Sequence, residues 1–455
     1  MYQTENREIK ALEAALAEND AFRVKTALEE LYPAQILEHW PKLSAEHRRV
    51  VLTLLSPPDA AEVFSHLEEA EQAELLEALP PWRVKEILEE LSLDDLADTI
   101  NAVEEENSPE AAQALLRQLD PETRAEVEEL TEYAEDQAGG IMTPEYIAVR
   151  DDMRVEEVFR FLRREAPDAE QIYVIYVVDA EEHLQGVLTL RDLIVADPKT
   201  KVAEIMNPDV IYVRDDTDQE EVARLMADYN FTVLPVVDEE KKLVGIVTID
   251  DVVDIIEEEA TEDIYRLGAV ESPELVYSQS SVWELWSARV RWLVILVITG
   301  SITSSILQGF ESVLAAVTAL AFYVPVLVGT GGNTGNQSST LIVRALATRD
   351  VELRDWWRVL RKELGVGFLL GLTLAALLSI KVLLDGEAQL LAVVGLSLGL
   401  VVLIANIAGA MLPILLRRLR LDPALISNPL IATITDITGL MIYLSVARWL
   451  LGLGI

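Results

Sequence analysis

The chain has 455 residues, enough for about three domains, and carries 78 Asp and Glu against 37 Lys and Arg, a formal net charge of −41. So acidic a chain repels nucleic acid and attracts cations, which excludes nucleic acid as a partner. The absence of cysteine excludes disulfides and thiolate metal sites.

The charge is unevenly divided along the chain. Residues 1–283 hold 24 basic and 68 acidic residues, a net charge of −44, whereas residues 284–455 hold 13 and 10, a net charge of +3. The second part is strongly apolar. The first ten residues, "MYQTENREIK", lack the apolar core of a secretory signal. We therefore expect an acidic cytoplasmic part followed by a membrane part.

A 24-residue repeat runs through residues 28–91. The aligned positions are Leu28, Leu52 and Leu76; Leu31, Leu55 and Leu79; Pro33, Pro57 and Pro81; Glu38, Glu62 and Glu86; Leu43, Leu67 and Leu91. A proline that opens each helix and apolar residues at helical spacing predict a stack of short helices. We expect this α-superhelix to span residues 6–132.

A second repeat follows. "IMTPEYIAVRDD" (141–152) returns as "IMNPDVIYVRDD" (205–216), and "YVVDAEEHLQGVLTLRDL" (176–193) returns as "PVVDEEKKLVGIVTIDDV" (235–252). Each copy contains helical and β-rich runs and resembles a CBS domain, so the pair is expected at 139–200 and 201–258. The resemblance implies regulation, and an adenine nucleotide such as ATP as a ligand. The expected contacts are Thr189, Arg191 and Asp192, or Thr248 and Asp251, with Phe231 or Tyr173 covering the adenine.

Residues 250–270, "DDVVDIIEEEATEDIYRLGAV", hold eight acidic residues and one basic residue, Arg266. Their apolar positions predict an amphipathic helix whose stripe contains Val253, Ile256, Ala260, Ile264 and Leu267. The segment is either a solvated linker helix or a connecting helix whose dense carboxylates bind cations. It leads directly into the membrane part.

Five apolar segments are long enough to cross a bilayer, at 290–310, 313–343, 364–384, 390–416 and 424–451. The connections before the first, after the second and after the fourth segment are rich in arginine. Because positive connections stay in the cytoplasm, we expect the N-terminus inside and the C-terminus outside a multi-pass plasma-membrane protein.

The second segment contains an uncharged polar run, "GTGGNTGNQSSTL" (329–341). It fits neither a P-loop nor a dinucleotide-binding fingerprint. Gly329, Gly332 and Gly335 have a spacing that permits close helix packing. Asn333 and Asn336 add amide groups, which lipid does not solvate. The run is therefore either a hydrogen-bonded helix contact or part of a pore lining.

Asp436 is the only acidic residue that lies deep within one of these expected spans. A carboxylate in a membrane is costly and marks a functional site by default, although a protonated Asp bonded to a neighbouring helix is the alternative. Asn428 lies two helical turns earlier, on a similar face. No histidine lies in any span, so only oxygen ligands are available there, which favours Mg²⁺ or Ca²⁺.

The order of these parts resembles the MgtE family of Mg²⁺ channels. "PVLVGTGGNTGNQ" (325–337) is similar to the family's P-x-x-x-x-x-G-G-N-x-G-x-Q signature, and "SNPLIATITDITG" (427–439) is similar to its ion-site helix. The resemblance implies a multidomain fold: an α-superhelix, an α/β CBS pair, a connecting plug helix at 254–280 and an all-α membrane domain of five helices at 284–455. It also implies a homodimer in membrane lipid, with Asp436 and Asn428 as pore ligands.

The resemblance further implies regulatory Mg²⁺ sites between the domains. Their ligands fall on Glu62, Asp94, Asp98, Asp218, Glu220, the Ala227 carbonyl, Asp251, Asp254, Glu259, Glu262, Asp263 and Asp422. Asn230 stands where the family can have an acid, which lowers the charge of one site. Glu62 has a second explanation, since its position recurs in the 24-residue repeat.

These features predict a channel or transporter that imports Mg²⁺ and closes when cytoplasmic Mg²⁺ binds the acidic domains, rather than an enzyme. Bound cations would screen the carboxylates and favour a compact, closed form. The alternatives are a transporter of Mn²⁺ or Co²⁺, and a membrane-anchored nucleotide-sensing CBS receptor that conducts nothing.

Overall fold

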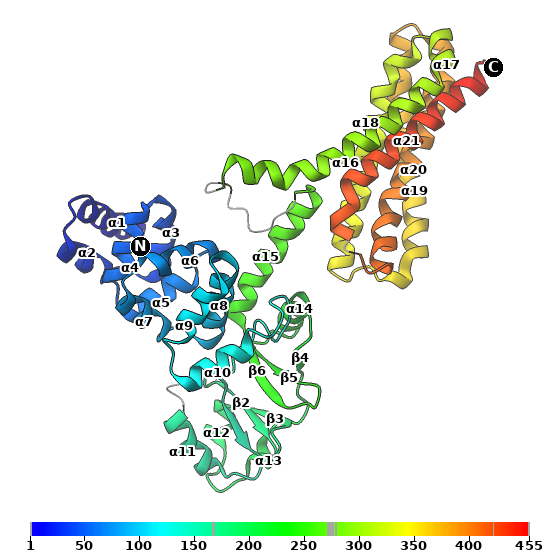
Figure 1. Cartoon of the computed structure of the whole chain (residues 1–455). Helices are drawn as coiled ribbons and strands as arrows, with labels where there is room; N and C mark the ends of the chain where they lie inside the picture. Colours follow the sequence, from blue (N-terminus) through cyan, green and yellow to red (C-terminus); the bar gives the residue numbers. More distant parts are fainter. Residues whose placement is uncertain (1, 166–168, 271–276, 278–279, 422, 454–455) are drawn as a thin grey trace. The chain divides into compact units, whose positions relative to one another are not determined.

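The computed structural model describes residues 2–165, 169–270, 277, 280–421 and 423–453; the side chains of residues 2–7, 106, 165 and 423–429 lie outside the description. The chain divides into two compact units, residues 1–256 and 257–455 (Figure 1). Each unit is described by itself.

The first unit begins with ten short helices. They are α1 (Tyr2–Ala17), α2 (Ala21–Leu28), α3 (Pro33–His39), α4 (Ala45–Leu54), α5 (Pro57–Ser65), α6 (Glu69–Ala78), α7 (Pro81–Leu88), α8 (Leu93–Glu106), α9 (Pro109–Leu116) and α10 (Pro121–Leu130). Pro33, Pro57 and Pro81, the repeated prolines, each open a helix, where a missing N–H costs nothing. Contacts between α3 and α5 and between α5 and α7 build the stack.

Two similar α/β repeats follow. The first contains β1 (Ala148–Arg150), α11 (Val155–Glu165), β2 (Val174–Val178), β3 (Leu184–Thr189), α12 (Leu190–Val195) and α13 (Val202–Ile205). The second contains β4 (Val213–Arg214), α14 (Gln219–Tyr229), β5 (Val233–Val237) and β6 (Leu243–Thr248). The strand orders are β1-β2-β3 and β4-β5-β6, and in each sheet the first pair is parallel and the second antiparallel. The sequence repeat is therefore a structural repeat.

The helical stack packs directly on the second repeat. Ala138 donates its N–H to the carbonyl of Thr217 at 2.7 Å, and Gly139 donates to Asp215 at 2.9 Å. One apolar core runs from the helices into α14, β5 and β6. This packing places α8 close to the N-terminal end of the following helix, α15 (Ile249–Leu267).

α15 confirms the helix expected over 250–270, but its buried positions differ from the expected stripe. Val252 and Ile255 are buried, whereas Val253, Ile256 and Ile264 are exposed. The connection from β6 to α15 sets the rotation of the helix, so the residues one position earlier than Val253 and Ile256, namely Val252 and Ile255, face the core of the second repeat.

The second unit is helical. Its elements are α16 (Val282–Gly309), α17 (Glu311–Ala316), α18 (Leu320–Ala347), α19 (Trp356–Leu384), α20 (Leu391–Arg418) and α21 (Pro423–Leu450). Within the described residues, four segments are long and apolar enough to cross a membrane: Val282–Gly309, Leu353–Leu384, Ala388–Arg418 and Leu430–Leu450. The remaining expected span, 313–343, corresponds to α18, which has 28 residues. Its polar run makes it less apolar than the other four.

α20 is the central helix of this bundle, because it contacts α18, α19 and α21. Glycines allow these close approaches. A Cβ atom placed on Gly371 would lie 2.8 Å from the carbonyl oxygen of Gly399, and one placed on Gly409 would lie 2.2 Å from that of Gly335. Both are shorter than real contacts, so α19 and α18 approach α20 only where a side chain is missing.

Candidate ion sites

The crossing of α18 and α21 forms the first candidate site. A Cβ atom on Gly335 would lie 2.6 Å from Ile431 Cγ2, and one on Gly332 would lie 3.7 Å from Thr435 Oγ1. The two helices run antiparallel, so Asp436 lies at about the depth of Gly331. The Asp436 side chain is half-buried and, within the described part of the chain, forms no ion pair or hydrogen bond.

The predicted glycine contacts are only partly made. Gly335 packs tightly and Gly332 makes an ordinary contact, whereas a Cβ on Gly329 would meet nothing within 4 Å. The second tight contact of α18 is at Gly331, four residues before Gly335. A Cβ atom on Gly331 would lie 2.8 Å from Val401 Cγ1. Within the described part of this chain Gly329 makes no such contact, because the i, i+4 pair Gly331 and Gly335 faces the neighbouring helices.

The polar run also gives α18 an exposed polar face. Asn333, Gln337 and Thr340 are exposed, and Asn336 is half-buried. The Oδ1 atom of Asn336 is buried and has no hydrogen-bond partner within the described residues. These amide and hydroxyl groups lie on a helix that crosses α21 at Thr435, the neighbour of Asp436, and their oxygens are suited to a hydrated cation.

One acidic residue of this unit was missed from the sequence. Glu363 lies in the second turn of α19, inside the apolar segment Leu353–Leu384. The span was expected to begin at residue 364, because the preceding residues are charged. Hydropathy alone does not distinguish a carboxylate in the second turn of a membrane helix from the solvated charged residues that precede it.

Asn428 and Asp422 are not tested by the geometry. Asp422 lies outside the described residues. Asn428 lies within α21, but its side chain also lies outside the description.

The second candidate site is an acidic cluster where α8 meets the first turn of α15. Asp94 and Asp95 lie on α8, and Asp250 and Asp251 open α15. Burial, together with the other carboxylates, raises the pKa of Asp95 to about 6 and the pKa of Asp251 to about 7. Burial also raises the pKa of Asp94, although Ser92 donates a hydrogen bond to it. The cluster thus holds negative charge at a desolvation cost that a cation would offset.

Two observations favour a cation at this cluster, although its carboxylate oxygens do not converge as a ready-made ligand set in the described structure. One carboxylate oxygen of Asp94, Oδ1, is buried without a hydrogen-bond partner in the described structure. The donors are all oxygen atoms, the set that Mg²⁺ and Ca²⁺ prefer. Asp98 lies one turn after Asp94 on α8. Glu62, in contrast, is exposed on α5, and its backbone carbonyl bonds to His66.

The expected ligands on α14 also have local structural roles. Asp218 is the N-cap of α14 and accepts a hydrogen bond from the N–H of Glu220 at 3.0 Å. The Ala227 carbonyl accepts from the N–H of Asn230 at 3.4 Å. Asn230 adopts the left-handed conformation, with φ of 55°, and ends the helix. Asparagine tolerates this conformation well, which explains its presence at this position without a metal.

The expected ligands on α15 are distributed around an acidic helix. Asp254 is exposed, Glu259 is half-buried, and Glu262 forms an ion pair with Arg266. Asp263 follows on the same helix. An existing ion pair reduces the charge that Glu262 offers to a cation.

The nucleotide contacts expected in the first repeat lie on exposed surface, whereas Thr248, the alternative in the second repeat, is buried. Thr189 and Asp192 form a capping box at the start of α12, where Thr189 Oγ1 donates to Asp192 Oδ2 at 2.6 Å. Arg191 lies between them and is exposed. Tyr173 is 71% exposed, whereas Phe231 stacks on Tyr229 and packs against the core. Tyr173 is thus better placed than Phe231 to stack on a base.

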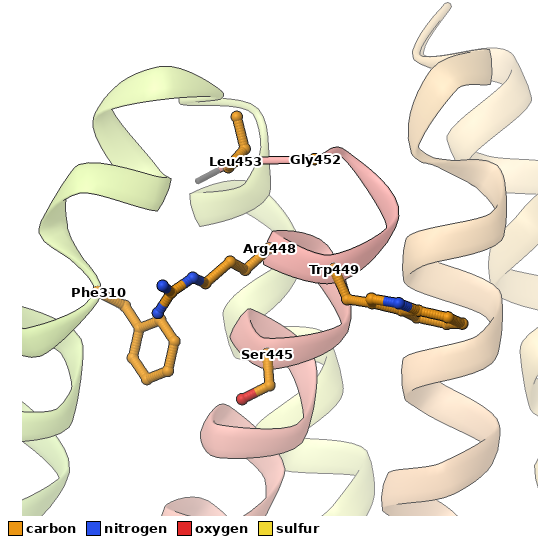
Figure 2. Close-up of a pocket in the computed structure, with 6 residues that line it drawn as sticks. All are labelled: Phe310, Ser445, Arg448, Trp449, Gly452 and Leu453. Carbon is orange, nitrogen blue, oxygen red and sulfur yellow. The ribbon is translucent and has the colours of Figure 1, made fainter. Parts of the chain in front are cut away.

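A further hollow of about 550 Å³ lies at the end of α21. Figure 2 shows the Arg448 side chain reaching across it toward Phe310, with Ser445 below and Trp449 turned away. An arginine and a tryptophan in the last turn of a span are typical of a membrane interface. The hollow is far along α21 from Asp436 and has no acidic lining residue.

Comparison with known proteins matches three family models to parts of this chain. Residues 324–446 match the MgtE family described as a divalent cation transporter, residues 31–136 match the MgtE intracellular N domain, and residues 138–199 and 202–258 match the CBS domain. Both Asp436 and the polar run of α18 lie in the first of these regions.

Among the relatives, the magnesium transporter MgtE of Thermus thermophilus is 68% identical over 97% of this chain and 98% of its own. The crystal structure of the cytosolic domain of the Mg²⁺ channel MgtE in complex with ATP is 66% identical, with a TM-score of 0.53, and covers 54% of this chain and 98% of that chain. The soluble part of a magnesium transporter is 32% identical, with a TM-score of 0.50, and covers 56% of this chain and 99% of that chain.

Proposed function

We propose, on the premise that this chain belongs to the MgtE family of divalent cation transporters, that it conducts Mg²⁺ across the cell membrane into the cytoplasm. The Thermus relative, similar over nearly its whole length, is named a magnesium transporter. The apolar helices of the second unit supply a multi-pass membrane domain in lipid. Its C-terminus lies outside in this proposal, and the acidic N-terminal part lies in the cytoplasm.

The observation that carries the proposal is the Asp436 carboxylate. It is half-buried at the glycine-packed crossing of α18 and α21 and has no protein partner among the described residues. A structural carboxylate in a membrane is paired or hydrogen-bonded, whereas a carboxylate that binds a passing ion leaves its oxygens open. Residues 284–455 contain no histidine or cysteine, so side-chain and backbone oxygens are the ligands available to a cation there, which suits a hard, hydrated ion.

The test is Mg²⁺ flux into liposomes that contain the purified full chain. Asp436→Asn keeps the size of the side chain and removes its charge, so we expect flux to fall by roughly tenfold or more while assembly is retained. Glu311→Gln, which removes an exposed carboxylate on α17, is the matched control and should conduct normally. Equal flux in Asp436→Asn and wild type would refute the proposed site.

The pore is proposed to lie between two copies of the chain, each contributing one Asp436. The polar residues Asn333, Gln337 and Thr340 are exposed on α18 although lipid does not solvate them. A second copy would cover this face or enclose water beside it. The mass of the detergent-solubilised protein, measured by light scattering, tests the homodimer directly.

The acidic cluster is proposed as a regulatory Mg²⁺ site that closes the channel. Burial and mutual repulsion raise the pKa values of Asp94, Asp95 and Asp251, and Asp94 Oδ1 has no partner within the described chain. Mg²⁺ bound there stabilises the arrangement of α8 against α15 by mass action. When cytoplasmic Mg²⁺ is scarce, the carboxylates repel and α15 is released, which opens the channel.

The CBS pair is proposed to bind ATP as a regulator. The similar cytosolic domain was crystallised with ATP, and Tyr173, Thr189, Arg191 and Asp192 are accessible in this chain. Equilibrium binding of ATP to the full chain tests this, with Tyr173→Ala weakening binding if the ring stacks on adenine. Tyr212→Ala, in the second repeat, is the aromatic control.

The same flux assay separates Mg²⁺ from other divalent ions. Oxygen ligands alone also accept Mn²⁺ and Co²⁺. The proposed function requires Mg²⁺ uptake at Mg²⁺ concentrations in the cytoplasmic range. Faster uptake of Mn²⁺ or Co²⁺ under equal gradients would mean that one of these ions, and not Mg²⁺, is the transported ion.

A further inference from the structure

Glu363 lies on α19 inside the apolar segment Leu353–Leu384, and nothing in the proposed ion path uses it. It is half-buried and lies on the same i, i+4 row of α19 as Val359, Gly367 and Gly371, all of which are buried against the bundle. The row faces α20. A carboxylate in such a row is costly in a membrane unless its oxygens are bonded.

The carboxylate is bonded to two other helices. Asn406 Nδ2 on α20 donates to Glu363 Oε2 at 2.7 Å and to the Glu363 backbone carbonyl at 2.9 Å. Ser338 Oγ on α18 donates to the same Oε2 at 3.3 Å. Asn406 and Ser338 are each only 3% exposed. One carboxylate oxygen therefore joins three helices inside the bundle.

The local sequence makes room for this network. A Cβ atom on Gly367, one turn after Glu363, would lie 3.2 Å from Asn406 Cβ and 3.3 Å from its Nδ2. Any larger side chain at Gly367 would push the amide away from Glu363. The glycine thus lets a short side chain reach both the carboxylate and the backbone of α19.

The network lies one turn from the closest approach of α18 and α20. Ser338 follows Gly335 by three residues, Asn406 precedes Gly409 by three residues, and Gly335 and Gly409 are in backbone contact. A glycine contact fixes the distance between two helices but leaves rotation about their axes weakly restrained. The bonds from Ser338 and Asn406 to one carboxylate restrain that rotation.

We propose that Glu363 is a positioning residue for ion conduction: through Asn406 and Ser338 it holds α18 at the rotation that packs Gly331 and Gly335 against α20 and α21, and so sets the direction of the Asn333 and Asn336 side chains. This inference rests on the proposed conduction by this membrane domain. Rotation of α18 by one residue position is about 100°, so even a fraction of that turn moves the amide groups off the ion path.

The test exchanges donor and acceptor across the network in the full chain. Asn406→Asp places two carboxylates against each other, and Glu363→Gln combined with Asn406→Asp restores a donor facing an acceptor. We expect Asn406→Asp to lower Mg²⁺ flux per folded channel by about tenfold, the order given by interaction energies of contacting residues. The double variant should recover a large part of that loss.

Two further readouts separate positioning from mere stability. The half-saturating Mg²⁺ concentration for flux should rise in Asn406→Asp and return in the double variant, whereas loss of stability alone would only lower the amount of folded protein. If Asn406→Asp does not fold, Ser338→Ala carries the test. It should shift the half-saturating concentration, and Ser397→Ala, at a fully buried serine of α20 without a described partner, should not.

The outcomes distinguish this inference from the proposed function. Unchanged flux in Asn406→Asp, or a double variant no better than the single, overturns the role of Glu363 and leaves conduction through Asp436 standing if wild type conducts. A wild type without Mg²⁺ flux overturns both.

Discussion

Single atoms decide how closely the membrane helices approach. Gly409 and Gly335 touch through their backbones, whereas Gly365, on α19, faces open space where a Cβ would lie. Helical glycines are thus of two kinds in this bundle. Glycine is required at position 409 for the close contact, whereas at position 365 it only increases the conformational entropy that is lost on folding.

We predict opposite effects for alanine at these two positions. Gly409→Ala places a Cβ 2.2 Å from the Gly335 carbonyl oxygen, so it should destabilise the membrane domain by about 1–3 kcal/mol or abolish assembly. Gly365→Ala should be neutral or stabilise by roughly 0.5–1 kcal/mol. Thermal unfolding of both variants in detergent measures the difference, and equal midpoints would contradict the close contact.

A second prediction concerns Asn230. Its φ of 55° favours Asn, Asp or Gly, so Asn230→Asp and Asn230→Gly should both leave the end of α14 intact. If the position contributes to a regulatory site, the Asp variant gains a charge and should close at lower cytoplasmic Mg²⁺. The Gly variant loses the side-chain oxygen and should need more. Identical inhibition curves for the two variants would remove this position from the regulatory set.

Sequence patterns predicted where the helices lie, but they did not predict which residues of each helix pack against its neighbours. The run 250–270 predicted α15 because charge and periodicity agree, yet the buried residues are Val252 and Ile255. Which face is covered depends on the turn after β6, a tertiary contact that periodicity cannot encode. Likewise, the spacing of Gly329, Gly332 and Gly335 predicted packing, but Gly331 and Gly335 make the tight contacts. Which partner helix lies where is settled only in the bundle.

The start of α15 also gives a pH prediction. In the folded chain the pKa of Asp95 is about 6 and that of Asp251 about 7, above their values in an unfolded chain. Between the unfolded and folded pKa values the native state binds more protons, so stability rises as pH falls from about 7 toward 4. Above about pH 7 both groups are charged in both states and their cost is fully present.

We therefore expect the Mg²⁺-free protein to unfold at a higher temperature at pH 5.5 than at pH 8. Mg²⁺ should raise the midpoint more at pH 8, where the carboxylates are ionised and free to bind it. Asp95→Asn should flatten the pH dependence, and Asp120→Asn, at an exposed N-cap whose pKa is lowered by hydrogen bonds, should not. A Mg²⁺ effect that is independent of pH would show that the cluster does not titrate as described.

The whole molecule couples an acidic cytoplasmic part to a nearly neutral membrane part. Residues 1–283 carry a net charge of −44, and such charges repel over about a Debye length, roughly 8 Å at physiological salt. Divalent ions that bridge carboxylates reduce this repulsion specifically, whereas monovalent salt only screens it. The difference between the two kinds of ion is therefore diagnostic.

We predict that millimolar Mg²⁺ protects the α15 region from protease and that monovalent salt of equal ionic strength does so much less. The variant neutralised at Asp251, Asp254, Glu259 and Asp263 should lose this protection, and its conductance should respond weakly to cytoplasmic Mg²⁺. Limited proteolysis across a Mg²⁺ titration, beside patch recordings, makes the measurement. Equal protection by Na⁺ would mean that the acids of α15 form only a solvated surface.

The polar run of α18 bears on how the protein is made. Helices leave the insertion machinery in chain order, so α18 enters the bilayer before α20 and α21, the helices that pack on Gly331 and Gly335, have been synthesised. A segment with so many amides is held poorly by lipid alone. We expect a chain ending at residue 352 to release α18 to the outer side, and the full chain to retain it across the membrane. A glycosylation acceptor placed after Ala347 distinguishes the two cases, because it is outside only when α18 has not been retained. The later helices would then act as the insertion partners of an earlier one.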